Sequence, residues 1–413
     1  MCSIKALIFL TLLSVAFGVS YEGYKVYKVT TESKLQNEYF KVLQSSPDFD
    51  FWSKLNKVGH PLTIMVAPKA QKGFEHFLVA NKIKFDVLID NVERTIQAEK
   101  EYHRSRSTSK SGRIAFDQYY RHDEINAYLE QLAADYPDIV TLDTLGQSYE
   151  KRDMKLIRIS SGSSDPPKPV IFVDAGIHAR EWIAPAVALY LINQLVETKD
   201  NSGLYEGVNW IILPSLNPDG YEYSWDEDRL WRKTVSPGTE CNGCDANRNF
   251  GFHWMESGAS SWECSETYAG KEAFSEVEAR NLRDYLNKTE NIEAYLTLHS
   301  YGQYLLYPWG YADILCDNWK ELDDLAHDMD DAISAVSGTR YTIGSSTETL
   351  YAAAGASDDW AMGGAGITIV YTMELPGGGI YGFDLPPEEI EGVVVESFEG
   401  LKVFGNYVAK NRK

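Results

Sequence analysis

The chain has 413 residues, of which 44% are hydrophobic and 24% are charged, a composition typical of globular rather than disordered proteins. Its formal net charge of −21 argues against nucleic-acid binding, which requires clustered positive charge. At this length we expect one large domain with a smaller partner.

The first 18 residues have the pattern of a cleaved signal peptide. Lys5 precedes a mostly apolar run over residues 6–17, which ends in small residues. The run is too short to cross a bilayer, and no later segment reaches about 18 uninterrupted apolar residues. We therefore expect a secreted protein without a membrane span. A core strand or helix is the alternative interpretation of this run.

The rest of the chain divides into a basic part and a very acidic part. Residues 19–113 carry 16 Lys and Arg against 11 Asp and Glu, whereas residues 114–413 carry 22 against 49. At about residues 103–113, the polar segment HRSRSTSKSGR predicts an exposed linker that trypsin-like proteases cleave. Opposite charge and a tether favour docking, so we expect the basic part to be an inhibitor or folding aid of the acidic part. A basic surface stretch without consequence is the alternative for the linker.

Residue patterns predict a small α+β domain followed by a large α/β domain. In the basic part, strand patterns occupy 24–30, 61–68 and 84–90, and helix patterns occupy 32–43 and 69–81. In the acidic part, strands are predicted at 154–160, 169–175, 208–216, 292–300 and 367–375, and helices at 123–135, 184–197, 275–287 and 317–334. Two of these strands are near-continuous apolar runs, which predicts a mainly parallel mixed sheet with helices on both faces.

Side chains that bind metals follow the predicted strands. His178 and Glu181 come just after the strand 169–175, and His299 lies at the end of the strand 292–300. Ligands of open α/β sheets bind outside the carboxyl ends of the strands, so we expect these side chains to meet. Two histidines and one glutamate bind zinc and leave a fourth position for water, as in catalytic zinc sites.

Zinc hydrolysis of an amide also requires a base and positive groups. Glu374 lies at the end of a further strand and is the predicted base, and a salt-bridged strand end is the alternative. Donors for an oxyanion and for a substrate carboxylate, which Arg binds bidentately, are Arg229, Arg232, Asn247 and Arg248. Taken alone, each Arg is more often part of a surface ion pair.

Other histidines are expected to have no role at a metal. His253 and Glu256 repeat the spacing of the predicted ligand pair but follow no buried strand, so we interpret them as a chance surface pair. His122 and His327 lie in polar, helix-like segments and are expected to be solvated.

The cysteine count favours disulfides. Cys2 leaves with the signal peptide, and the four remaining cysteines predict two bridges in a secreted chain. Cys241 and Cys244 form a CxxC motif, which also occurs in zinc ribbons, but no second CxxC motif is present to complete one.

Taken together, the motifs of residues 114–413 resemble a known family, the zinc metallocarboxypeptidases of the pancreatic A/B type, and most of all its B-type members. They match in order and at family-like spacing: GIHAREW, NPDGY, DRLWRKT, DANRNF, CSETYAG, HSYGQYLLYPWGY, SDDW and YTMEL. This family is synthesised as procarboxypeptidases. The resemblance therefore implies an activation propeptide with a small α+β, ferredoxin-like fold at 19–113, followed by a zinc carboxypeptidase domain at 114–413.

The resemblance also implies roles for individual side chains. The ligands of one zinc ion correspond to His178, Glu181 and His299, the general base to Glu374, and the oxyanion stabiliser to Arg232. The groups that hold the substrate's terminal carboxylate correspond to Asn247, Arg248 and Tyr351, and neighbouring substrate contacts to Arg180, Arg229 and Tyr301. The family's disulfide corresponds to Cys241 with Cys264, which leaves Cys244 with Cys316 as the expected second bridge.

The expected substrate class depends on Asp358. It falls where B-type enzymes carry an acidic residue at the base of the specificity pocket and A-type enzymes an apolar one, so the resemblance implies a preference for C-terminal Lys or Arg. A partly desolvated carboxylate is satisfied by a cation. The resemblance also implies that Gly310 and Ser346 line this pocket, and both are small enough to admit a long side chain. In the alternative, Asp358 turns away and caps a helix together with Asp359.

We therefore expect a secreted, monomeric zymogen of a digestive zinc exopeptidase. Its partners would be peptide or protein C-termini as substrates, its own propeptide as inhibitor and a trypsin-like protease as activator. An A-type preference for apolar or aromatic ends and an inactive secreted binding protein of the same fold are the alternatives. The sequence departs from the family at Pro376, which replaces a basic residue, and in the run 361–370, which is one residue longer, so we expect a loop of different shape beside Glu374.

Overall fold

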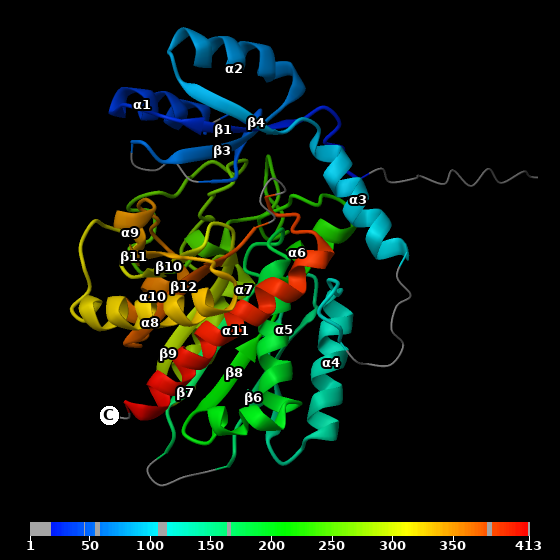
Figure 1. The fold of residues 1–413 in the computed structure, drawn as a ribbon, viewed down its shortest axis with the longest axis vertical. Helices are drawn as coiled ribbons and strands as arrows, with labels where there is room; N and C mark the ends of the chain where they lie inside the picture. Colours follow the sequence, from blue (N-terminus) through cyan, green and yellow to red (C-terminus); the bar gives the residue numbers. More distant parts are fainter. Residues whose placement is uncertain are drawn as a thin grey trace, which may run out of the picture.

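The computed structural model describes residues 18–44, 46–53, 58–105, 114–162, 167–377 and 382–411. The predicted signal peptide, apart from Gly18, and residues 106–113 of the predicted linker lie outside these ranges. Figure 1 shows the smaller, blue domain lying across one end of the larger domain. No helix in the described part of the chain is long and apolar enough to cross a membrane.

The smaller domain has the β-α-β-β-α-β order that is typical of ferredoxin-like folds. Its elements are β1 (Lys25–Thr30), α1 (Lys34–Leu43), β2 (Phe49–Phe51), β3 (Pro61–Val66), α2 (Pro68–Ala80) and β4 (Lys84–Ile89). The strands form one antiparallel sheet in the order β2-β3-β1-β4. Because side chains alternate along a strand, Tyr27 and Ile64 pack under the helices, whereas Val26 and Met65 join a second cluster with Leu230 of the larger domain.

Helix α3 (Val92–Ser105) leaves this sheet and runs down the side of the larger domain (Figure 1). Its last turn includes residues 103–105, which the sequence analysis assigned to the exposed linker. The ring of His103 lies 5.0 Å from that of Trp225 and 5.9 Å from that of Tyr119, measured between centroids. These contacts support the last turn of the helix, because the half-buried His103 packs against aromatic side chains of the larger domain, whereas residues 104 and 105 are exposed.

The larger domain is built on an eight-stranded mixed sheet, in agreement with the predicted fold class. Its strands are β5 (Val140–Gln147), β6 (Asp153–Ile159), β7 (Val170–Ala175), β8 (Asn209–Leu213), β9 (Ile292–Ser300), β10 (Tyr304–Tyr307), β11 (Thr342–Ser345) and β12 (Ile369–Leu375). They lie in the order β11-β10-β12-β9-β7-β8-β6-β5. The central strands β12, β9, β7 and β8 are parallel to one another, so their carboxyl ends share one edge of the sheet.

Helices cover both faces of this sheet. One face packs against α4 (His122–Asp135), α5 (Ile183–Val196), α8 (Trp319–Ser337) and α11 (Pro387–Lys410), and the other against α7 (Val277–Lys288) and α10 (Ser357–Gly363). The remaining helical segments are η1 (Lys199–Tyr205), α6 (Pro218–Asp226), η2 (Ala246–Arg248) and α9 (Ser346–Thr349). Every strand and helix predicted for this domain is present within a few residues of its predicted bounds.

The cysteines are only partly paired as expected. Cys241 and Cys264 form a disulfide, with their Cα atoms 5.1 Å apart, but Cys244 and Cys316 are both buried free thiols. The Cys244 Sγ lies 3.2 Å from the backbone oxygen of Tyr268, whereas Cys316 belongs to the core cluster beneath α8. The predicted Cys244–Cys316 bridge is therefore wrong, because the two side chains are buried in different surroundings.

The prediction that His122 is solvated is also wrong. Its side chain is buried at the first position of α4, where Nε2 lies 3.0 Å from the backbone oxygen of Asp153, and burial lowers its pKa. His327 is exposed, as predicted. The segment around His122 contains many polar residues because α4 is amphipathic, and His122 lies on its buried face together with Ile125 and Leu129.

Candidate active site

The predicted ligands meet where parallel strands end. After β7 ends at Ala175, a turn closed by a 3.3 Å hydrogen bond from the Glu181 backbone nitrogen to the His178 backbone oxygen carries both side chains before α5 begins. His299 is the next-to-last residue of β9 and lies opposite Glu374 of β12 in the sheet register. The expectation that ligands gather beyond the carboxyl ends of the strands is thus met.

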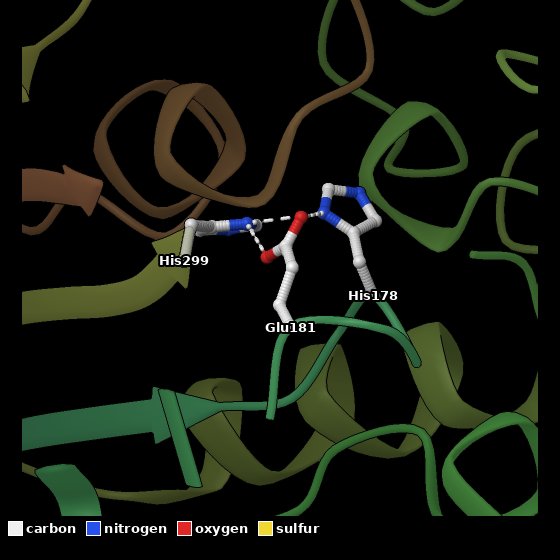
Figure 2. A group of neighbouring side chains, drawn as sticks. All are labelled: His178, Glu181 and His299. Carbon is white, nitrogen blue, oxygen red and sulfur yellow. Dashed lines mark hydrogen bonds and ion pairs between the residues drawn. The ribbon is translucent and has the colours of Figure 1, made fainter. Parts of the chain in front are cut away.

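Figure 2 shows Glu181 lying between the imidazole rings of His178 and His299. One carboxylate oxygen is 2.8 Å from Nδ1 of His178, the other is 3.1 Å from Nδ1 of His299, and the two Nδ1 atoms are 3.1 Å apart. No side chain of this triad is more than 3% exposed. One ion placed among these atoms contacts all three groups, since the candidate ligand atoms lie within 4.8 Å of one another.

The second nitrogen of each ring has a hydrogen-bond acceptor of its own. His178 Nε2 lies 3.1 Å from Asp245 Oδ1, and His299 Nε2 lies 3.2 Å from Thr297 Oγ1. Hydrogens on the two Nε2 atoms leave the Nδ1 lone pairs pointing into the triad. Burial and the charge of Arg232 lower the pKa of His178, which favours the neutral ring that binds metals.

This set of ligands fits a catalytic zinc site. Two neutral imidazoles and one carboxylate are a known donor set for zinc with one position left for water. Burial raises the pKa of Glu181, but its close contacts with the rings of His178 and His299 lower it by more, so the pKa lies well below its usual range and the group is ionised. Three lone pairs that face one another at these distances repel, and a divalent cation among them would replace that repulsion with attraction.

The predicted base and oxyanion stabiliser lie beside the triad. Glu374 and Arg232 line the same cavity as Glu181, with a volume of about 50 Å³. Arg232 is buried, donates from Nη2 to Asp245 Oδ2 at 2.9 Å, and places Nη1 3.8 Å from a Glu181 oxygen. Asp245 thus orients both Arg232 and His178, and these two groups are fixed relative to each other.

The three residues predicted to hold a terminal carboxylate are also neighbours. Arg248 donates from Nη2 to the Tyr351 hydroxyl at 2.8 Å and from Nη1 to the backbone oxygen of Asn247 at 2.7 Å. The Asn247 side-chain oxygen accepts from the backbone nitrogen of Ser357 at 2.9 Å, which ties it to α10. Tyr351 and Arg232 line a cavity of about 720 Å³ together with residues from the loop 258–267.

Asp358 is buried, and its carboxylate has a fixed orientation. Oδ2 accepts from the Thr372 hydroxyl and Oδ1 from the Asp359 backbone nitrogen, both at 2.9 Å. Asp359 instead accepts from the backbone nitrogen of Gly310, and a Cβ atom at Gly310 would lie 3.6 Å from Ser346 Cβ. The helix-capping alternative holds in part, because Asp358 Oδ1 accepts from a backbone N–H in the first turn of α10, whereas the Asp359 carboxylate is directed to the backbone of Gly310.

The smaller domain occupies the other three predicted substrate contacts. Arg180 donates from Nη1 to Asp50 Oδ2 at 2.7 Å, and Arg229 donates to both oxygens of Glu99 in α3 at 2.5 and 3.1 Å. Tyr301 lines the cavity of the predicted base together with residues of the β2–β3 segment. The cleft is therefore covered by the smaller domain, which binds its outer arginines.

The prediction that His253 and Glu256 are a surface pair away from the metal is confirmed. Two residues that hydrogen-bond to the ligand histidines were not predicted. His253 and Glu256 form a partly exposed ion pair at 2.7 Å and are not part of the triad. The missed residues are Asp245 and Thr297, the acceptors for the two ligand histidines. Signals for both were available, since Asp245 begins the motif DANRNF and Thr297 lies two residues before His299, on the same face of its strand.

Comparisons with known proteins agree with this geometry. A model of the zinc carboxypeptidase family matches residues 125–400, and a model of the carboxypeptidase activation peptide matches residues 27–99. The chain belongs to the zinc carboxypeptidase family. It is 52% identical over 298 residues to carboxypeptidase B of Astacus astacus, covering 70% of this chain and 97% of that protein. It is 36% identical over 420 residues to carboxypeptidase B of Rattus norvegicus, covering 98% and 99%.

Among solved structures, this zinc carboxypeptidase is similar to the carboxypeptidase A from Helicoverpa armigera. The TM-score is 0.89 at 34% sequence identity, with 95% of this chain and 98% of that chain covered. The chain is thus a procarboxypeptidase, a metallocarboxypeptidase hydrolase preceded by an activation peptide. Zn²⁺ is the metal of this family, and the cluster of His178, Glu181 and His299 is the site that fits it.

Proposed function

We propose that this zymogen is secreted and yields a B-type carboxypeptidase, which removes one C-terminal Lys or Arg at a time from peptides and proteins. The observation that carries the proposal is the buried carboxylate of Asp358, held by Thr372 at the position where the B-type enzymes carry an acidic residue. Burying a carboxylate is costly unless a cation pairs with it, so a Lys or Arg side chain is the ligand that this pocket favours. The identity to the Astacus astacus carboxypeptidase B supports the same preference.

In the proposed mechanism His178, Glu181 and His299 hold the metal ion. When bound, zinc supplies Lewis-acid chemistry that activates water for attack on a peptide carbonyl. Glu374, buried beside the triad, takes a proton from the attacking water and passes it to the leaving amine. Arg232, whose guanidinium is fixed by Asp245, stabilises the negative charge that develops on the carbonyl oxygen.

Arg248, Asn247 and Tyr351 are proposed to bind the free carboxylate of the substrate. Arg248 is 1% exposed, and its Nη2 already contacts the Tyr351 hydroxyl, so the guanidinium is oriented before substrate arrives. A guanidinium binds a carboxylate through two parallel hydrogen bonds, which an internal peptide bond cannot accept in the same way. This requirement restricts cleavage to the last residue of a chain.

Residues 19–113 are proposed to act as the inhibitor and residues 114–413 as the enzyme. Asp50 and Glu99 neutralise Arg180 and Arg229, and the β2–β3 segment covers the cavity that holds Glu374. A trypsin-like protease would cut within the basic segment 106–113 and so separate the two parts.

The experiment is trypsin activation of the secreted full-length protein, followed by hydrolysis of matched peptides that end in Arg or Phe. We expect chelator-sensitive activity with at least a tenfold higher kcat/KM for the Arg peptide. The Asp358→Ile variant should lower kcat/KM for the Arg peptide by about 30-fold or more, since an unpaired buried cation costs about 2 kcal/mol or more. The Phe peptide is the internal control for folding.

Two outcomes would contradict the proposal. A parent enzyme that prefers the Phe peptide is A-type, and a protein that binds one zinc ion but hydrolyses neither peptide is an inactive relative. Sequencing the N-terminus of the secreted zymogen tests the signal peptide, and we expect the mature chain to begin at about residue 19.

A further inference from the structure

Three polar residues lie side by side in the buried central strands of the sheet. Asp174 of β7 is in register with Thr297 of β9, which is in register with Thr372 of β12. Asp174 and Thr297 are fully buried and Thr372 is 6% exposed. Polar side chains in a sheet covered on both faces require hydrogen-bond partners, so a row of three needs an explanation.

The row lies directly beneath the active site. Side chains two residues apart along a strand point to the same face, which places His299 above Thr297 and Glu374 above Thr372. Thr372 donates to the specificity carboxylate of Asp358, as described above. Thr297 therefore occupies the position from which a side chain supports a metal ligand.

The Thr297 hydroxyl connects a carboxylate to the ring of His299. It donates to Asp174 Oδ1 at 2.8 Å, and its oxygen lies 3.2 Å from His299 Nε2. A hydroxyl has one hydrogen, so while that hydrogen points to Asp174 the oxygen accepts from Nε2–H of His299. The ring then keeps its hydrogen on Nε2 and presents the Nδ1 lone pair to the triad.

We propose that Asp174 is a positioning residue for the metal site, which fixes the tautomer and orientation of His299 through the Thr297 hydroxyl. The two ligand histidines are thus supported differently: Asp245 accepts from His178 directly, whereas Asp174 acts on His299 through one intervening group. Outer partners of this kind typically contribute about 10- to 100-fold to metal affinity. The proposal rests on the proposed role of His299 as a zinc ligand.

The test measures zinc affinity rather than activity. The full-length proenzyme is stripped of metal and titrated with zinc in competition with a chromophoric chelator. Thr297→Val, which removes the hydroxyl at nearly constant volume, should weaken zinc binding about 10- to 100-fold. Thr297→Ser keeps the hydroxyl and should bind zinc within threefold of the parent, and Asp174→Asn should lie between the two. Because Thr297→Val leaves the buried carboxylate of Asp174 without its donor, thermal unfolding of the metal-free proteins defines the temperatures at which every variant is folded, and zinc affinities are compared there.

The other outcomes of this titration contradict either the positioning role of Asp174 or the assignment of the metal site. If the Val and Ser variants bind zinc equally under conditions in which both metal-free proteins are folded, the positioning role is overturned. If the parent itself does not bind one zinc ion, or if His299→Ala binds zinc as tightly as the parent, the assignment of the metal site fails instead. The two failures are therefore distinguishable.

Discussion

The arginines around the cleft form an outer pair and an inner pair with different partners. Arg180 and Arg229 bind carboxylates of the activation peptide, whereas Arg232 and Arg248 bind groups of the catalytic domain itself. If the activation peptide leaves after cleavage, as proposed, the outer pair loses its partners and the inner pair keeps them. The difference indicates that the peptide blocks access to a site whose catalytic groups are already in place.

The largest expected effect is on kcat of the activated enzyme, and it comes from a substitution in the inner pair. Arg232→Met keeps an unbranched side chain but removes the donors, and it should lower kcat of the activated enzyme by about 10²- to 10³-fold, because the developing oxyanion loses its stabilising charge. Its affinity for the cut activation peptide should change by less than threefold, since the peptide binds the outer arginines. Kinetics with the Arg peptide measure the first value, and activity per molecule at several protein concentrations measures the second. A large change in peptide affinity in the Arg232→Met variant would show that the inner arginines also bind the activation peptide and would contradict the proposed difference between the pairs.

A substitution that removes a partner of the outer pair should have a smaller effect, and it should change peptide binding rather than kcat. Glu99→Ala should weaken binding of the cut peptide by about 30-fold, equivalent to about 2 kcal/mol, because it leaves the buried Arg229 guanidinium without its charged partner. The kcat of the activated enzyme should not change. Glu101→Ala removes an exposed carboxylate of the same helix and is the matched control. Equal effects of both substitutions would show that helix α3 binds without a specific ion pair.

Binding of the cut peptide should also depend on pH. Asp384 of the catalytic domain is buried near Glu99 and Arg229, beside Thr95 and Tyr119, and burial and the charge of Glu99 raise its pKa to about 7. When α3 leaves, the pKa should fall towards about 4, so docking takes up a proton between these values. Affinity should be highest at low pH and fall as pH rises through 7, by at most about tenfold per pH unit.

The inhibition constant of the cut peptide between pH 5.5 and 8.5 measures this dependence. Asp384→Asn should flatten the profile, and Glu388→Gln, an exposed carboxylate nearby, should leave it unchanged. A profile that rises with pH, or one that survives the Asn substitution, contradicts the assignment to Asp384.

The position of the metal triad was predictable from sequence because its residues lie at or just after the carboxyl ends of predicted strands. Parallel strands align their carboxyl ends, so His178, Glu181, His299 and Glu374 had to converge once the strands were recognised. Helix α11 was not among the predicted helices although its buried side chains recur every three or four residues from Ile390 to Val408. Its valine-rich segment has the local propensity of a strand, and packing against α5 and α8 overrides that propensity.

Contacts between distant segments were not predictable. The partners of Arg180 and Arg229 come from the activation peptide, and nothing in the local sequence of either arginine indicates how that domain docks. The proposed second disulfide failed for a related reason, since a count of cysteines carries no information about the distance between Cys244 and Cys316.

The helical last turn of α3 has a bearing on when the enzyme begins to work. The basic residues proposed as cleavage points include several beyond residue 105, and a cut among these leaves α3 whole. Glu99 then remains on Arg229, and His103 remains among the aromatic rings. Cutting and release are separate steps with separate rates, and release is governed by mass action. At high concentration, cleaved zymogen would therefore remain inhibited until dilution allows the activation peptide to dissociate.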